Sequence, residues 1–225
     1  MIQSNLLQKF NKIRHYYFDK KDSLEKFQIK SSSLVTLEQV HGNKIILINT
    51  QKNNYYKSYD GAVTSQSLFL GISTADCLPI FLYDPVKTII AAVHAGWKGL
   101  YLDILKRAMA KINRLGGCPG NLYVGIGPHI RVCCYHVPLS RVLLFEKKQK
   151  AHPFSFSVIF NSLWYLDLEK IVLMEMLKLG IPRKQIDISQ VCTSCDLRFH
   201  SFRRDGPSSK RSLNIIGQIT TSKIE

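Results

Sequence analysis

Two histidines and one cysteine in this chain have side chains suited to binding a metal ion. They are His41, Cys77 and His94, in the segments QVHG, TADC and VHAGW. Imidazole nitrogen and thiolate sulfur together suit zinc or copper, and three protein ligands leave a fourth position for water or substrate. Spacings of 36 and 17 residues mean that only the fold can bring them together. Burial without a metal is therefore the alternative for each of them.

Apolar segments next to these residues predict strands that would position them. Residues 68–73 lead into the segment TADC, residues 80–83 follow it, and residues 88–93 end at His94. Continuous runs rich in β-branched residues are typical of strands buried on both faces. A ligand at the end of such a strand has a rigid support and opens onto a loop-lined edge, where functional residues concentrate.

The rest of the chain contains strands and helices without strict alternation. Apolar periodicity predicts helices over residues 99–115 and 167–179, with Asp167 as the N-cap of the second. Further strands are expected over residues 44–49, 122–126, 185–191 and 213–219, with an early strand and helix in residues 1–33. The mixed order favours an α+β fold, and we expect a single domain over residues 1–225 in which helices flank mixed β-sheets.

The composition excludes several classes of protein. Of the 225 residues, 45% are hydrophobic and 21% are charged, as in ordinary globular proteins. No apolar segment approaches the roughly 20 residues that cross a bilayer, and residues 1–5 do not begin a secretory signal. Six cysteines without an export signal indicate reduced thiols or metal ligands. We therefore expect a cytoplasmic protein without a membrane partner.

The net charge of +15 raises the possibility of nucleic-acid binding. However, the basic residues are scattered from Lys9 to Lys223, and the sequence contains none of the common DNA- or RNA-binding motifs. We expect no specific nucleic-acid binding, and a basic surface suits small phosphate-bearing molecules equally well.

Two pairs of cysteines compete with the triad as a metal site. Cys192 and Cys195 have CxxC spacing, and Cys133 and Cys134 are adjacent. A lone CxxC is half of a zinc ribbon, and adjacent cysteines suit a shared tetrahedral site poorly. We expect the triad to bind the metal and Cys134 to pack beside Tyr135 instead.

The segment FHSFRRDG contains two consecutive arginines. If it is a strand, Arg203 and Arg204 point to opposite faces, one toward a phosphate or carboxylate and the other toward Asp205 or solvent. Arg204 is slightly favoured for the anion, with Lys98 as a further candidate. Asp76 either orients a ligand or acts as a general base, or it caps a turn.

Five motifs in order give the chain a clear family resemblance. The segments QVHG, TADCLPI, VHAGWKGL, GIGPHIRVCCY and FHSFRRDG, within residues 35–217, resemble the YfiH/laccase-domain family of purine nucleoside phosphorylases, formerly described as multicopper polyphenol oxidases. The resemblance implies an α+β fold related to cysteine hydrolases and one zinc ion held by His41, Cys77 and His94. It also implies phosphorolysis of adenosine, inosine and methylthioadenosine, with adenosine deaminase activity; copper-dependent phenol oxidation is reported for the family.

The chain departs from the family pattern in three places. The part before the first motif is short and lacks the usual Ser-Leu-Asn-Leu segment and Asn-Arg pair. His136 replaces the glutamate of Cys-Cys-Tyr-Glu, and residues 208–210 replace Thr-Gly-Arg. The resemblance therefore carries the metal triad over intact and leaves part of the substrate pocket open to change.

Several reactions remain open for such a site. Zinc with an open position can activate water for deamination, whereas phosphorolysis needs a phosphate held at the ribose anomeric carbon. A multicopper oxidase needs more histidines than this site offers among the seven in the chain. Cys77 with His94 can instead form a hydrolase or amidase, including one that edits peptidoglycan precursors. A non-catalytic basic binding protein is the last alternative.

Overall fold

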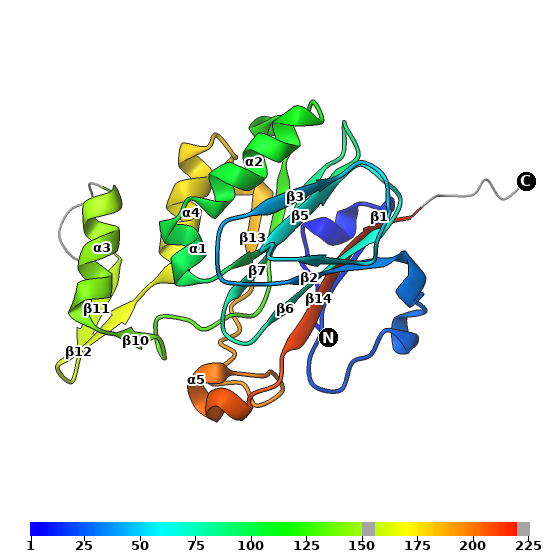
Figure 1. Cartoon of the computed structure of the whole chain (residues 1–225). Helices are drawn as coiled ribbons and strands as arrows, with labels where there is room; N and C mark the ends of the chain where they lie inside the picture. The colour runs from blue at the N-terminus through cyan, green and yellow to red at the C-terminus, as the bar shows by residue number, and fades with distance from the viewer. Residues whose placement is uncertain (150–155, 220–225) are drawn as a thin grey trace, which may run out of the picture.

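A six-stranded mixed sheet lies between a layer of helices and a second, five-stranded sheet (Figure 1). The computed structural model describes residues 1–149 and 156–219. The six-stranded sheet has the order β13-β9-β7-β8-β5-β3, and the five-stranded sheet has the order β1-β14-β6-β2-β4. A small third sheet has the order β10-β12-β11. This arrangement confirms the predicted α+β class with mixed sheets.

Among the described residues, every α-helix comes after residue 95, whereas strands occur along the whole chain. The strands are β1 (Ile13–Tyr17), β2 (Leu34–Glu38), β3 (Ile45–Ile48), β4 (Tyr55–Lys57), β5 (Gly61–Thr64), β6 (Phe69–Thr74), β7 (Leu78–Asp84), β8 (Ile89–Ala95), β9 (Tyr123–Ile126), β10 (His136–Val137), β11 (Ser157–Phe160), β12 (Leu163–Leu166), β13 (Ile186–Ile188) and β14 (Ser212–Gln218). The α-helices are α1 (Trp97–Tyr101), α2 (Ile104–Arg114), α3 (Leu139–Gln149), α4 (Leu168–Lys178) and α5 (Phe202–Asp205). Short 3₁₀ helices occupy Leu7–Lys9, Glu25–Phe27, Ser31–Ser33, Pro119–Asn121, Arg183–Gln185 and Gly206–Ser208.

The central strands β7 and β8 are buried at every position and mostly apolar, because both of their faces are covered. Ile80 and Leu82 point toward the core shared with the helices. Phe81 and Tyr83 point toward the core shared with the five-stranded sheet. All seven residues of each strand are buried. The continuous apolar runs in the sequence therefore correspond to strands buried on both faces, as predicted.

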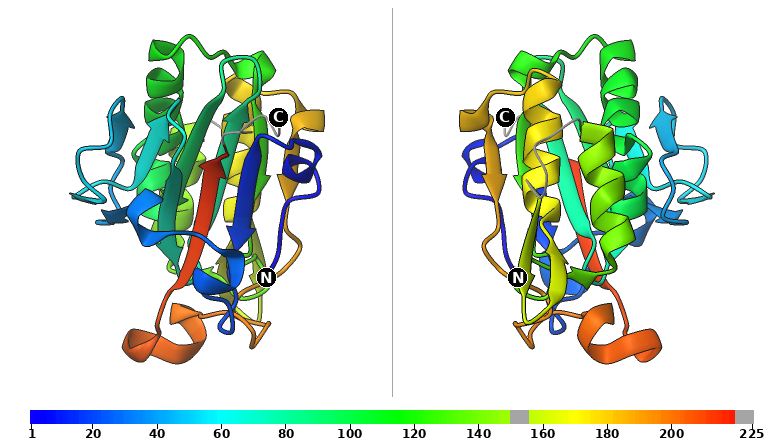
Figure 2. Two further views of the ribbon diagram at one scale, coloured as in Figure 1. Left: turned by 90° about the vertical axis from the view of Figure 1, so that its right-hand side faces the viewer. Right: turned by 90° about the vertical axis from the view of Figure 1, so that its left-hand side faces the viewer.

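The helices cover one side of the six-stranded sheet, as the two side views show (Figure 2). The predicted helix over residues 99–115 is divided into α1 and α2, because Asp103 between them has a left-handed φ of 61°. Asp167 caps α4 as predicted, accepting a hydrogen bond from the Lys170 amide. The helix expected in residues 1–33 is wrong, because among those residues only single 3₁₀ turns form beside β1.

The other predicted strands form close to their expected positions. β13 is shorter than predicted and covers only Ile186–Ile188. In the described part of the chain, no helix combines the length and the apolar character needed to span a membrane.

Candidate metal centre and substrate pocket

The three candidate metal ligands lie together at one end of the six-stranded sheet. His94 belongs to β8, Cys77 precedes β7, and His41 lies in the loop between β2 and β3. Leu78 pairs with Ala95 across β7 and β8, which places Cys77 beside the end of β8. One ligand atom from each of the three side chains lies within 4.8 Å of those of the other two. The fold thus gathers three segments that are far apart in the sequence.

Gly96, two residues after His94, allows the close approach of the Cys77 thiol. A Cβ atom on Gly96 would lie 3.0 Å from Sγ of Cys77 and 3.5 Å from a ring carbon of His41. The contact with the Cys77 sulfur is tight, whereas that with His41 is an ordinary van der Waals distance, so a larger residue here would press on Cys77. The glycine in the segment VHAGW is therefore explained by the packing of the triad.

Asp60 holds two of the ligands in place. Its Oδ1 lies 2.9 Å from Nδ1 of His94 and accepts a hydrogen bond of 2.8 Å from the His41 amide, while Oδ2 accepts one of 2.7 Å from the Gly42 amide. A carboxylate on Nδ1 favours the tautomer that carries its proton there, which leaves Nε2 free to bind a metal. Sequence reasoning missed Asp60, because an aspartate and a glycine before a strand look like an ordinary turn.

The charges within the site favour a thiolate beside an imidazolium. Burial alone would raise the pKa of Cys77, but the positive charge of His94 and hydrogen bonds from His41 and His94 lower that pKa to about 6. Burial would lower the pKa of His94, but the Cys77 charge and the Asp60 carboxylate raise it to about 9. The site therefore stabilises a negative sulfur and a positive charge close to it.

This donor set fits zinc or copper. Two imidazole nitrogens and one thiolate sulfur are borderline-soft ligands, and Asp60 supplies the outer carboxylate that metal-bound histidines usually contact. Because His41 is exposed while His94 is buried, the centre opens toward solvent on one side only. The three residues therefore suit an ion that keeps one position for a substrate or water.

The three candidate metal ligands form one wall of a cavity of about 560 Å³. Three arginines and three aromatic residues line the other walls: Arg141, Arg203, Arg211, Trp97, Tyr135 and Phe202. The guanidinium carbon of Arg141 lies 4.2 Å from the Trp97 ring centroid, and that of Arg203 lies 5.3 Å from the Tyr135 ring centroid. The cavity thus combines positive charge with flat apolar surfaces.

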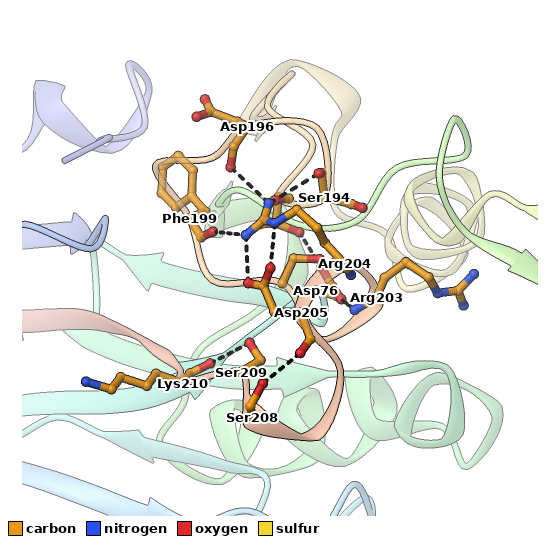
Figure 3. Close-up of polar contacts among 12 residues, drawn as sticks. Asp76, Ser194, Asp196, Phe199, Arg203, Arg204, Asp205, Ser208, Ser209 and Lys210 are labelled. Atoms are coloured by element: carbon orange, nitrogen blue, oxygen red, sulfur yellow. Dashed lines mark hydrogen bonds and ion pairs between the residues drawn. The ribbon is translucent and has the colours of Figure 1, made fainter.

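Asp76 links two loops that line the cavity, through hydrogen bonds to both of its carboxylate oxygens. Its Oδ1 accepts a hydrogen bond of 2.7 Å from the Thr193 hydroxyl, and its Oδ2 accepts one of 2.6 Å from the backbone amide of Arg203 (Figure 3). Each carboxylate oxygen thus already has a strong partner. These contacts give Asp76 a structural role, holding two loops together, which is closer to the turn cap that the sequence left open than to a general base.

The two consecutive arginines lie in the short helix α5, so the strand expected there is wrong. Ser201 begins the helical turn by accepting a hydrogen bond from the Arg204 amide. Successive side chains of a helix diverge by about 100°, so Arg203 and Arg204 still point in different directions. Arg203 lines the cavity, and its Nη1 donates hydrogen bonds to the carbonyl oxygens of His136 and Cys134 at 2.9 and 3.3 Å.

The guanidinium nitrogens of Arg204 donate hydrogen bonds to other groups of the protein (Figure 3). Its Nε and Nη2 both donate to the Asp205 carboxylate at 2.8 Å. Its Nη1 donates to the carbonyl oxygens of Thr193 and Ser194 at 2.9 and 3.2 Å, and its Nη2 donates to that of Phe199 at 2.8 Å. The slight preference for Arg204 as the anion ligand is therefore reversed, because its donors already have acceptors while Arg203 faces the cavity.

Lys98 does not line this cavity and its side chain is exposed. The basic residues that sequence reasoning missed are Arg141 on α3 and Arg211 just before β14. Arg141 lies outside the recognised motifs, and Arg211 directly follows residues 208–210, where the chain departs from the family's Thr-Gly-Arg.

The comparison with protein families agrees with this geometry. Residues 19–218 match the family described as multi-copper polyphenol oxidoreductase laccase. The chain belongs to this YfiH/laccase-domain family. The resemblance seen in the sequence motifs is thereby confirmed.

Curated relatives in the YfiH/laccase-domain family carry a more specific name. The purine nucleoside phosphorylase YlmD of Bacillus subtilis is 33% identical over 85% of this chain and 73% of its own length. A purine nucleoside phosphorylase of Clostridium acetobutylicum is 31% identical over 80% of this chain and 75% of its own.

Solved structures of YfiH/laccase-domain proteins share the fold. The Bacillus licheniformis protein YfiH has a TM-score of 0.81 at 28% identity, covering 87% of this chain and 78% of its own. YlmD from Geobacillus stearothermophilus has a TM-score of 0.80 at 25% identity, covering 92% and 91%.

This YfiH/laccase-domain protein also has a second group of possible metal ligands. Sulfur atoms of Cys133, Cys134, Cys192 and Cys195 lie within 4.8 Å of one another. The sequence indicated that adjacent cysteines suit a shared site poorly, but a turn brings the sulfurs of both Cys133 and Cys134 close to Cys195. We call these four residues the cysteine cluster.

Proposed function

We propose that the protein is a purine nucleoside phosphorylase that acts on adenosine, inosine and methylthioadenosine. The observation that carries this proposal is the cavity in which the metal triad faces Arg203 and Arg141 beside aromatic rings. Relatives named purine nucleoside phosphorylase support it. Guanidinium groups bind phosphate through paired hydrogen bonds, and aromatic rings offer flat surfaces for a purine.

The reaction joins phosphate to the sugar and releases the base. A phosphate oxygen forms a bond to the ribose anomeric carbon as the bond from that carbon to the purine nitrogen breaks. The electron pair of the broken bond leaves with the purine, which takes up a proton. The products are the free base and ribose 1-phosphate. In this proposal Arg203 and Arg141 bind and orient the phosphate, and Trp97 and Tyr135 border the purine.

We propose zinc as the resident ion, held by His41, Cys77 and His94, with copper as the alternative that the same donors allow. When bound, such an ion would supply Lewis-acid polarisation of a substrate group. The protein's own contribution is to keep the ligands in position: Asp60 orients His94, and Gly96 leaves room for the thiol. An open position beside the cavity also favours deamination of adenosine, with water in place of phosphate, as a second activity.

A cysteine hydrolase or amidase is the runner-up, and one observation favours it. Cys77, His94 and Asp60 form a thiol–imidazole–carboxylate series, in which the pKa of the thiol is lowered, against the effect of burial, by the neighbouring His94 charge. His41 distinguishes the two readings. A metal-dependent enzyme loses both its ion and its reaction in His41→Ala, whereas a cysteine hydrolase retains the reacting pair and its turnover.

The deciding experiment measures metal content and products together. Protein purified without added metal is analysed for zinc and copper, then incubated with adenosine or inosine in the presence and absence of phosphate. We expect free base and ribose 1-phosphate only when phosphate is present. If ammonia were the sole product, the proposed activity would be reduced to deamination. Hydrolysis of an amide without turnover of any nucleoside would favour the cysteine hydrolase.

A further inference from the structure

The cysteine cluster joins two turns that are distant in the sequence. Cys133 and Cys134 lie in a turn between β9 and β10, closed by a hydrogen bond of 3.0 Å from the Cys134 amide to the Arg131 carbonyl. Cys192 and Cys195 bound a second turn, closed by one of 2.9 Å from the Asp196 amide to the Cys192 carbonyl. All four are free thiols.

The four sulfur atoms lie close enough together to share one tetrahedral ion. A zinc–sulfur bond of about 2.3 Å places neighbouring sulfurs roughly 3.8 Å apart around a tetrahedral ion. Sγ of Cys195 lies 3.8 Å from that of Cys133 and 3.2 Å from that of Cys134, and all four sulfurs lie within 4.8 Å of one another. We propose that the cysteine cluster binds a second, structural zinc ion, with all four coordination positions filled by protein thiolates.

The surroundings of the cluster support thiolate ligands. The Arg131 amide donates a hydrogen bond of 3.4 Å to Sγ of Cys192, which is the kind of outer contact that stabilises a metal-bound sulfur. Arg204 holds the carbonyl oxygens of Thr193 and Ser194 inside the CxxC turn. The turn therefore presents its two sulfurs from a fixed backbone.

An ion accounts for the whole cluster better than a disulfide does. A disulfide would use two of the sulfurs and leave the other two crowded against it. Four thiolates around one divalent ion use all of them, and CxxC is a frequent zinc-ligand spacing. Closed four-thiolate sites are structural, which sets this cluster apart from the open triad of His41, Cys77 and His94.

The proposed ion would fasten the wall of the substrate pocket. The first turn supplies the carbonyl oxygens of Cys134 and His136 that hold Arg203. The second turn carries Thr193, whose hydroxyl is bound by Asp76. Joining the two turns fixes Arg203 and Tyr135 relative to the triad. The inference concerns metal binding and does not depend on which reaction the pocket performs.

The test counts zinc in variants of the full chain, purified under reducing conditions. We expect about two zinc ions per chain in the parent and about one in the triple variant His41→Ala, Cys77→Ala, His94→Ala. Adding Cys192→Ser and Cys195→Ser to that triple variant should remove the remaining ion. Cys118→Ser is the matched control, because Cys118 is an exposed cysteine outside the cluster and should leave the count unchanged.

A spectroscopic measurement covers the case in which the combined variant fails to fold. The triple variant is loaded with cobalt(II), which reports thiolate ligands through sulfur-to-metal charge-transfer bands and tetrahedral geometry through intense visible bands. We expect both signatures, and Cys195→Ser should weaken the charge-transfer bands. A triple variant without zinc and without these bands would overturn the proposal. Thiol titration of the reduced parent would also contradict the proposal if it found two fewer reactive thiols than the sequence contains and if removal of metal by a chelator did not restore them.

Discussion

Asp60 and His94 make a buried contact in which the carboxylate oxygen lies 2.9 Å from Nδ1 of the imidazole. The Asp60 side chain is completely buried and the His94 side chain is 3% exposed. The same carboxylate binds the amides of His41 and Gly42. A single aspartate therefore sets the orientation of one proposed ligand and the backbone position of another.

Replacing Asp60 by asparagine should weaken metal binding more than it weakens the fold. The amide keeps the shape of the side chain but loses the charge that supports the His94 tautomer, and changes to such outer contacts lower metal affinity roughly 10–100-fold. Competition with a chromophoric chelator measures the affinity. Asp84→Asn is the control, because Asp84 is also buried at the end of a strand but caps a remote turn. Equal losses in the two variants would argue against the orienting role.

Arg203→Lys and Arg204→Lys should have different effects. Lys at position 203 keeps the charge without the planar fork, so we expect the apparent KM for phosphate to rise about tenfold, equivalent to about 1.4 kcal/mol. Zinc content and melting temperature should stay at parent values. Arg204→Lys should instead lower the free energy of unfolding by about 1–3 kcal/mol, because buried carbonyl groups lose their donors. The opposite pattern would assign the anion to Arg204.

Gly96→Ala tests the packing behind the triad. The added methyl group would lie 3.0 Å from Sγ of Cys77, so we expect weaker zinc binding with a nearly unchanged fold. Gly120→Ala is the matched control, because a Cβ there meets no atom within 4 Å. Parent-like zinc affinity in Gly96→Ala would show that Cys77 can move aside or is not a ligand.

His15 should make the fold sensitive to acid. Its Nε2 accepts a hydrogen bond of 2.8 Å from the Ser4 amide. Burial lowers the pKa of His15 to about 4, although the nearby Asp187 charge opposes this shift. Because the folded pKa lies below the unfolded value of about 6.5, the stabilising contribution is complete above that value and is lost as the pH falls toward 4.

The measurement is urea unfolding of the parent and of His15→Gln at pH 7.5 and pH 5. Glutamine can accept the Ser4 hydrogen bond but does not titrate. The parent should lose more stability between the two pH values, by up to about 1.4 kcal/mol per pH unit below 6.5. Equal losses in parent and variant would show that His15 does not govern this acid sensitivity.

The sequence predicted the parts of the site that depend on local patterns. His94 follows a run that is apolar because its strand is buried on both faces, and that pattern is visible without a structure. The N-cap of α4 at Asp167 is likewise a local feature. Both features can be predicted from a single sequence, because they depend only on residues that are close together in the chain.

The remaining parts depend on contacts between distant segments. Asp60 contacts His94 across paired strands, and Arg141 reaches the cavity from a separate helix. The adjacent cysteines 133 and 134 were judged unsuited to a shared site, yet the turn that contains them aims both sulfurs at Cys195. The spacing of residues within one segment cannot predict contacts between distant segments, because these contacts depend on the path of the whole chain.

The position of β14 affects the order in which the molecule can fold during synthesis. β14 is the last strand in the sequence, but it lies between β1 and β6. A ribosome adds roughly 5–20 residues per second, so the interval between the emergence of His94 and that of β14 is on the order of ten seconds. During that time β1 has no strand to join, and the edge of β6 opposite β2 lacks its neighbour. The proposed metal ligands are thus available to a nascent chain well before the sheet behind them closes, and early capture of the proposed ion would help hold β6, β7 and β8 together while the last strand is made.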